Sequence, residues 1–193
     1  MKRIFAILAA CCLLAAEKTN AQLEAGNVIV GADLANLNFG LNKGSFTTIN
    51  LTPKGQWLIK NNVAIGGYLN FGIVTAKDYA TYTSYGFGLL ARYYIIDENI
   101  NMLKKGNWFF EGSAGFQGEN VEGGNSTNGL GLGFGPGYAY FITHNVALES
   151  LLKFDAALGF GNTTTTSNLN LSLGFQIYLP GRGTANRVRS NEQ

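Results

Sequence analysis

The strongest constraint on the fold is the strict alternation of side-chain type between Asn168 and Leu179. Six large apolar residues occupy every second position of this segment, namely Leu169, Leu171, Leu173, Phe175, Ile177 and Leu179. Successive side chains point to opposite faces of a β-strand, whereas a helix would spread the same pattern around its circumference. The segment is therefore predicted to be a β-strand with one apolar face.

Seven earlier segments show similar alternation. They are Asn27 to Phe39, Phe46 to Leu58, Val63 to Val74, Ser84 to Ile95, Asn107 to Gln117, Asn128 to Phe141 and Val146 to Leu158. Most are long enough to cross a bilayer as tilted strands, which takes about 9–11 residues. A hydrocarbon core has no water for unpaired backbone groups, so a sheet placed there has to close on itself. The sequence predicts an all-β fold, an eight-stranded antiparallel up-and-down transmembrane β-barrel.

The predicted connections alternate between tight turns and longer polar loops. Tight turns are expected at Ile59–Asn62 and Ile142–Asn145, and the longer loops are Thr75–Thr83, Gly118–Thr127 and Phe160–Ser167. In transmembrane barrels the tight turns face the periplasm and the longer loops face outside. Both termini are then expected on the periplasmic side, where Asp97–Gly106 would be an unusually long turn.

The first 21 residues have the layout of a secretory signal peptide, with a basic start followed by the apolar run Ile4–Ala16. This run is shorter than the roughly 20 residues of a membrane-spanning helix. We expect it to direct export and to be cleaved before Gln22. Alternatively, Leu8–Cys11 could act as a lipobox that leaves Cys11 acylated.

The predicted organisation is therefore a signal peptide (1–21), a barrel (22–179) and a polar periplasmic tail (180–193). Both cysteines, Cys11 and Cys12, lie in the signal peptide. The mature chain would then have no thiol, disulfide or cysteine metal ligand.

The composition fits a barrel better than a soluble domain or a helical membrane protein. Charged residues make up 13% of the chain, against about 25% in ordinary soluble domains. The mean hydropathy of +0.06 is far below that of a helical membrane protein. A formal net charge of +2 is too small to indicate nucleic-acid binding.

A strand–turn–strand unit occurs twice in the sequence. Seven positions of the two copies are identical: Pro53, Ile59, Asn62, Val63, Ala64, Leu69 and Phe71 align with Pro136, Ile142, Asn145, Val146, Ala147, Leu152 and Phe154. These units resemble the repeated hairpin of the OmpA/OmpX-like outer-membrane β-barrel family. The resemblance implies a Gram-negative outer-membrane protein that contacts outer-membrane lipid.

The segment Ser172–Leu179 resembles the C-terminal signal that the barrel-assembly machinery reads, although it does not end the chain and lacks a final aromatic residue. We expect that machinery to be a partner during biogenesis, and the folded protein to be a monomer.

Aromatic residues gather near the predicted strand ends. A periplasmic girdle at the membrane interface is expected from Trp57, Tyr93, Trp108, Tyr140 and Tyr178. The alternative is that these rings fill the core of a soluble β-protein. In the predicted outer segment from Thr75 to Tyr85, the candidate surface contacts are Tyr79, Tyr82 and Tyr85.

If the apolar face contacts lipid, the opposite face carries charges into the lumen. The expected lumen charge network consists of Asp33, Arg92, Glu111, Glu149, Lys153 and Asp155. Single buried charges are very costly, so these residues should pair, as the family resemblance also implies. The glycine series Gly131–Gly137 would leave room for long side chains. Such a network could plug the lumen, or it could gate a path for small solutes.

Other chemistry has little support, and we expect no catalytic residue, metal site or cofactor. His144 is the only histidine, which excludes a site of several histidines and disfavours a Ser-His-Asp arrangement. The ladder Gly129–Gly137 lacks the spacing of a phosphate-binding loop.

The sequence therefore favours a structural or interaction barrel with a plugged lumen over an enzyme. The alternatives are a narrow pore for small solutes and, with less support, a lipid-modifying enzyme. A soluble lipocalin-like barrel is the alternative fold, and it would require the series Leu169–Leu179 to face inward.

Overall fold

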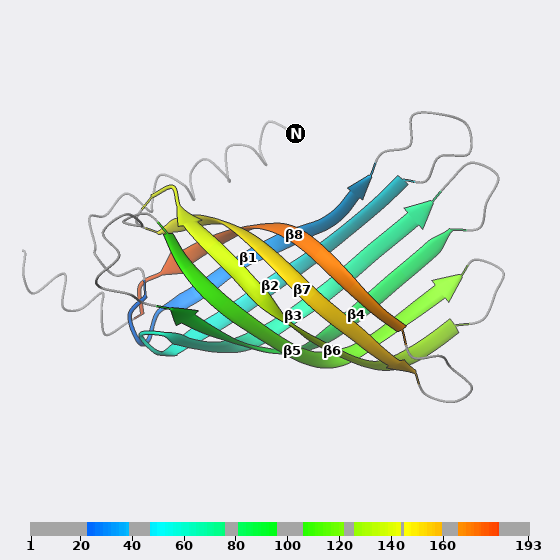
Figure 1. Cartoon of the computed structure of the whole chain (residues 1–193), viewed down its shortest axis with the longest axis horizontal. Helices are drawn as coiled ribbons and strands as arrows, with labels where there is room; N and C mark the ends of the chain where they lie inside the picture. Colours follow the sequence, from blue (N-terminus) through cyan, green and yellow to red (C-terminus); the bar gives the residue numbers. More distant parts are fainter. Residues whose placement is uncertain are drawn as a thin grey trace, which may run out of the picture.

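The computed structural model describes residues 23–38, 47–75, 81–95, 106–121, 126–143, 145–159 and 166–181. They form eight strands: β1 (Val28–Asn38), β2 (Thr47–Lys60), β3 (Val63–Thr75), β4 (Tyr82–Ile95), β5 (Gly106–Val121), β6 (Ser126–Phe141), β7 (Val146–Gly159) and β8 (Thr166–Leu179). Each strand pairs antiparallel with the next, and β8 pairs with β1, so the sheet closes into a barrel (Figure 1). The predicted eight-stranded up-and-down barrel is confirmed.

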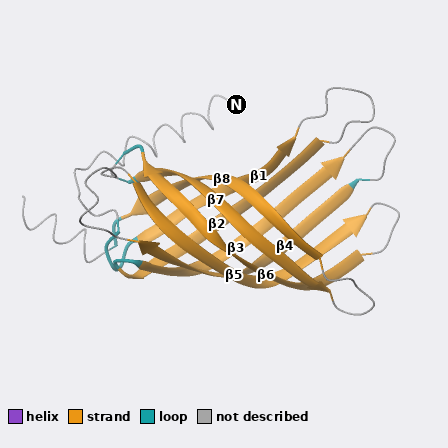
Figure 2. Cartoon of the chain, viewed as in Figure 1, coloured by secondary structure: helices purple, strands orange, loops and turns teal. Residues whose placement is uncertain are grey.

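The two described turns lie at one end of the barrel (Figure 2), which we call the turn end. Asn61 and Asn62 join β2 to β3 there, and the segment after Phe141 joins β6 to β7. The opposite end, which we call the loop end, is where β1, β3, β5 and β7 finish. The predicted long turn Asp97–Gly106 lies almost entirely outside the described residues, as do the signal peptide and most of the tail.

Observed strand boundaries stay close to the predicted ones, with the largest difference at the hairpin of β5 and β6. Here β5 continues to Val121, although we predicted that it would end at Gln117. Glu119 pairs with Thr127, and Asn120 pairs with Ser126. Polar residues can extend a ladder in this way where the hairpin rises beyond the apolar band.

The outer surface of the barrel is apolar. Leu89 is 75% exposed and Leu171 is 62% exposed, and both are outward-facing members of an alternating strand. A water-soluble barrel would bury such residues, so this surface requires a lipid environment. The lipocalin-like alternative, which required the leucines of β8 to face inward, is therefore wrong. Among the described residues, no helix is long and apolar enough to cross a membrane.

The turn-end half of the lumen is packed with apolar and aromatic side chains, which we call the apolar plug. Its members are Ile29, Leu58, Ala64, Tyr94, Phe109, Ala139, Phe141, Ala147, Leu151 and Tyr178, and Leu23 packs against them. The residues just before β1 and just after β8 are held here by hydrogen bonds. Gly26 N donates to Leu58 O at 2.7 Å, and Gly181 N donates to Asn27 Oδ1 at 3.0 Å.

Candidate functional site in the barrel lumen

Strand alternation decides which charged side chains enter the lumen. Outward leucines and aromatics fix the face of each strand, and the residues between them point inward. Five buried charged residues reach the lumen in this way from five different strands. We call them the charged cluster: Asp33 on β1, Lys54 on β2, Arg92 on β4, Glu111 on β5 and Glu149 on β7.

The charged cluster is one continuous chain of ion pairs across the barrel. Lys54 Nζ lies 2.6 Å from Asp33 Oδ2 and 2.8 Å from Glu111 Oε1. Arg92 Nη2 lies 2.7 Å from Glu111 Oε2, and its Nη1 lies 2.8 Å from Glu149 Oε2. Positive and negative groups therefore alternate from Asp33 to Glu149.

Neutral side chains complete the hydrogen bonding of the cluster. Tyr178 Oη donates to Glu149 Oε1 at 2.9 Å, and Gln176 Nε2 donates to Asp33 Oδ1 at 3.0 Å. Arg92 Nη1 donates to Tyr94 Oη at 3.0 Å, and the Tyr94 and Tyr178 hydroxyls lie 2.9 Å apart. Within the described residues, three buried side-chain atoms have no hydrogen-bond partner: both polar atoms of the Gln56 amide, and the Oε1 atom of Gln176.

Burial makes these contacts necessary. The five side chains of the cluster are between 0% and 6% exposed. Removing several charges from water is costly, and the cost is offset only where partners and hydrogen bonds are well placed. The cluster has three carboxylates and two cations, so its formal charge is −1 when all five groups are ionised. Donors such as Tyr178 and Gln176 help to stabilise the excess negative charge.

The charged cluster rests on the apolar plug. The guanidinium carbon of Arg92 lies 4.0 Å from the centroid of the Phe109 ring, which belongs to the plug. Tyr94 and Tyr178 belong to both layers, because their rings pack in the plug and their hydroxyls bond to the cluster. The two layers together fill the lumen from its middle to the turn end.

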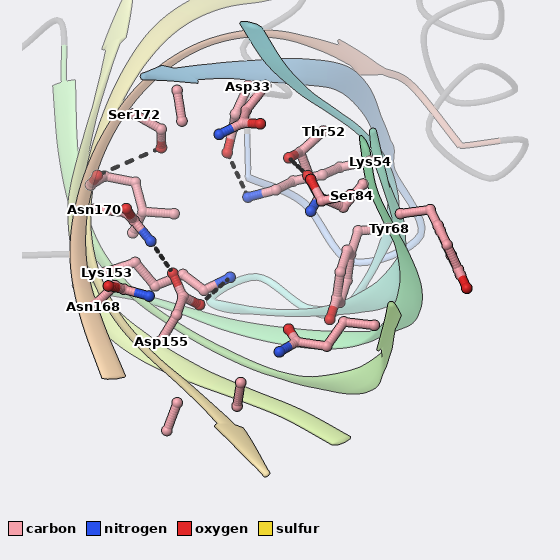
Figure 3. A pocket seen from close by; sticks show the side chains of 18 of the residues that line it. Asp33, Thr52, Lys54, Tyr68, Ser84, Lys153, Asp155, Asn168, Asn170 and Ser172 are labelled. Atoms are coloured by element: carbon pink, nitrogen blue, oxygen red, sulfur yellow. Dashed lines mark hydrogen bonds and ion pairs between the residues drawn. The ribbon is translucent and has the colours of Figure 1, made fainter. Parts of the chain in front are cut away.

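Above the charged cluster the lumen opens into a polar cavity of about 410 Å³, which we call the outer pocket. Its lining begins at Asp33 and Lys54 and reaches Glu119 and Asn168 near the loop end. Figure 3 shows its side chains converging from strands all around the barrel. Arg92, Glu111 and Glu149 are not part of the lining, so the pocket is blind toward the turn end.

The predicted lumen network is therefore divided into two groups. The structure brings Asp33, Arg92, Glu111 and Glu149 together in the charged cluster. Lys153 and Asp155 lie in the wall of the outer pocket, where their charged atoms are 3.3 Å apart.

Sequence reasoning missed Lys54, which joins Asp33 to Glu111. A signal was present, because Leu51 and Trp57 are outward-facing residues of the same strand and even-numbered positions between them must point inward. The glycines of β6 do leave room, as we expected. A Cβ on Gly133 would meet Lys153 and Asp155, and one on Gly137 would meet the Phe109 ring.

Four of the five predicted girdle residues lie on the outer surface near the turn end: Trp57, Tyr93, Trp108 and Tyr140. The prediction that Tyr178 belongs to the girdle is wrong, because its side chain is 1% exposed and faces the lumen. It occupies an even position of β8, between the outward-facing Ile177 and Leu179. Nearness to a strand end suggested the membrane interface, but alternation decides the face.

The structure describes two of the three candidate surface-contact residues. Tyr82 and Tyr85 are exposed residues of β4 near the loop end, and Tyr79 lies outside the described residues. Tyr82 Oη donates to Glu119 Oε2 at 3.3 Å, and Tyr85 Oη donates to Asn128 Oδ1 at 2.8 Å. His144 also lies outside the described residues. Among the residues that the structure covers, no group of three or more His, Cys, Asp and Glu could hold a metal ion.

No protein-family model and no curated protein matches the sequence. Several solved structures are similar in fold, and two of them serve as examples. Neisserial surface protein A is 18% identical with a TM-score of 0.58, and the match covers 78% of this chain and 95% of that one. The N-terminal β-barrel domain of Pseudomonas aeruginosa OprF is 14% identical with a TM-score of 0.50, covering 80% and 98%. The chain therefore has the fold of the small outer-membrane β-barrels, the class to which the OmpA/OmpX-like resemblance pointed.

Proposed function

We propose that this protein is exported to the outer membrane of a Gram-negative cell and serves there as a structural or interaction barrel with a sealed lumen. In this role it is neither an enzyme nor an open channel. The observation that carries the proposal is the pair of layers that fills the lumen, with the charged cluster resting on the apolar plug.

The contacts of the cluster argue against passage of solutes. A path past its middle would have to separate Arg92 from Glu111 or from Glu149. Each of these groups is buried, and breaking a buried ion pair by leaving one partner alone costs about 3–5 kcal/mol. The apolar plug beneath would also have to move its aromatic rings. A closed lumen is the ground state that these contacts favour.

The interaction role is assigned to the loop end and the surrounding lipid. Tyr82 and Tyr85 expose aromatic rings at the loop end, and exposed aromatic residues are common anchors of protein contacts. The continuous apolar outer face suits a monomer surrounded by outer-membrane lipid, delivered there by the barrel-assembly machinery.

Cell fractionation together with heat-modifiable gel mobility tests the location. A membrane barrel should fractionate with outer membranes and migrate differently before and after boiling. Recovery of the protein in the soluble periplasmic fraction would refute the proposal.

Planar-bilayer recording tests the sealed lumen. We expect no discrete conductance steps from the purified barrel. Steps that change in the Glu149→Ala variant, but not in the control Glu119→Ala at the exposed rim, would instead support the narrow pore. Altered lipid A on overexpression, lost in His144→Ala, would support the lipid-modifying enzyme.

A further inference from the structure

We infer that the outer pocket binds a neutral, polyhydroxylated solute of about monosaccharide size, which enters from the loop end. This inference goes beyond the structural role proposed above. It depends on the loop-end half of the lumen, whereas the sealed lumen depends on the charged cluster and the apolar plug.

The size and closure of the pocket indicate binding and not passage. Its volume of about 410 Å³ falls within the range of small-molecule sites, which is roughly 300–1,000 Å³. Lys54 and Asp33 form the end of the pocket, and the buried members of the charged cluster lie beneath them. A solute that enters from the loop end must leave by the same route.

The charges of the pocket argue for a neutral ligand. Lys153 pairs with Asp155 at 3.3 Å, and Lys54 is already held by Asp33 and Glu111. The remaining lining acid, Glu119, is exposed near the loop end and accepts a hydrogen bond from Tyr82. A charged solute would lose hydration without finding a free counter-charge in the depth of the pocket.

The polar lining has the mixed donor and acceptor character that hydroxyl groups match. Amide and hydroxyl groups both donate and accept hydrogen bonds, as does each hydroxyl of a polyol. Within the described residues, five lining side chains form no hydrogen bond, so their polar atoms are available to a ligand: Asn50, Tyr68, Ser84, Gln117 and Asn168. Of these, Tyr68 has another contact, because Lys153 Nζ lies 5.6 Å from the centroid of its ring. They come from five different strands, so a central solute could be contacted from several sides.

Glycines keep this space open. A Cβ on Gly72 would meet the side chains of Asn50 and Ser84, and a Cβ on Gly131 would meet that of Gln117. The polar side chains therefore lie against glycine positions along the wall and do not fill the centre.

Tyr68 also lies against glycines, because a Cβ on Gly88 would meet its ring and a Cβ on Gly115 would meet its hydroxyl. In Figure 3 the ring lies along the wall, across the pocket from Asn168 and Asn170. An aromatic face beside hydroxyl-binding groups suits the mixed apolar and polar surface of a sugar ring.

The test uses the full-length mature barrel, refolded in detergent micelles, with D-glucose as the probe. Solution NMR follows the side-chain amide signals of Gln117 and Asn168 during the titration. We expect saturable shifts with glucose and none with arginine or glutamate at equal concentration.

The blocking variant is Gly72→Leu, because the atoms nearest to an added Cβ there belong to movable side chains and not to backbone. We expect it to weaken glucose binding by at least about tenfold, the effect of losing roughly one or two hydrogen bonds. The matched control is Gly112→Leu, which adds the same side chain on the lipid-facing side, where an added Cβ meets nothing within 4 Å.

Heat-modifiable mobility tests whether both variants fold. If Gly72→Leu does not fold, Gln117→Leu serves as a second blocking variant. The inference would be overturned by an absence of saturable shifts with glucose, by shifts with the charged solutes alone, or by equal binding in Gly72→Leu and Gly112→Leu. None of these outcomes bears on whether the lumen is sealed toward the turn end.

Discussion

Replacing Arg92 with methionine should be among the most destabilising single changes in this barrel. Arg92 donates to both Glu111 and Glu149, and also to Tyr94. Methionine fills a similar volume but has no donor. Three buried carboxylates would then share the single cation Lys54, and the formal charge of the cluster would change from −1 to −2.

The size of the effect follows from this loss of partners. Removing one member of a buried ion pair costs about 3–5 kcal/mol, mainly because the remaining charge is left uncompensated. Glu149 is affected most, since the hydroxyl of Tyr178 is the hydrogen-bond partner that remains to it among the described residues. Adding Glu149→Gln to Arg92→Met removes that stranded charge and should restore about 1–3 kcal/mol.

Urea unfolding of the barrel in lipid vesicles, followed by tryptophan fluorescence, measures these differences in the free energy of unfolding. Lys60→Met is the matched control, because it removes an exposed cation near the turn end and should stay within about 0.5 kcal/mol of the parent. The reasoning would be refuted if Arg92→Met unfolded within about 1 kcal/mol of the parent. It would also fail if the second substitution gave no recovery.

Two further substitutions test the two faces of the wall. Leu171→Arg places a charge on the lipid face and should cost about 2–4 kcal/mol if the site lies near the bilayer midplane; an unchanged free energy of unfolding in vesicles would contradict lipid exposure. Tyr178→Phe removes a hydroxyl that donates to a buried carboxylate and should cost about 1.5–3 kcal/mol in the same assay. The control Tyr140→Phe changes an outward tyrosine and should have little effect, so equal losses in the two variants would show that Tyr178 has no special role.

Much of the fold could be predicted because alternation is a local property of the chain. The series Leu169–Leu179 identifies a strand and its lipid-facing side without any knowledge of the neighbours. Closure of the sheet follows from the need to satisfy backbone groups in lipid. The contact between Arg92 and Glu111 could also be predicted, because these residues lie directly opposite each other on adjacent strands.

Contacts across the lumen were harder to predict. Lys54 on β2 reaches Glu111 on β5, and Arg92 on β4 reaches Glu149 on β7. Two strands separate the members of each pair, so their meeting depends on the tilt and stagger of the closed barrel. The same geometry places Lys153 and Asp155 above the charged cluster instead of inside it. Strand alternation gives the face of a residue but not its depth relative to distant strands.

The contrast between the two halves of the lumen has a physical cause in the sequence. Both halves are enclosed by the same eight strands, and a barrel of this size is only just wide enough for its own side chains. Whether the lumen is filled or open at a given depth must therefore depend on the side chains placed there. Toward the turn end the lumen receives Tyr94, Phe109 and Tyr178, whereas glycines such as Gly72 and Gly131 face it toward the loop end. The outer pocket thus follows from the choice of small residues and not from the architecture, which is why one added side chain at Gly72 should be enough to close it.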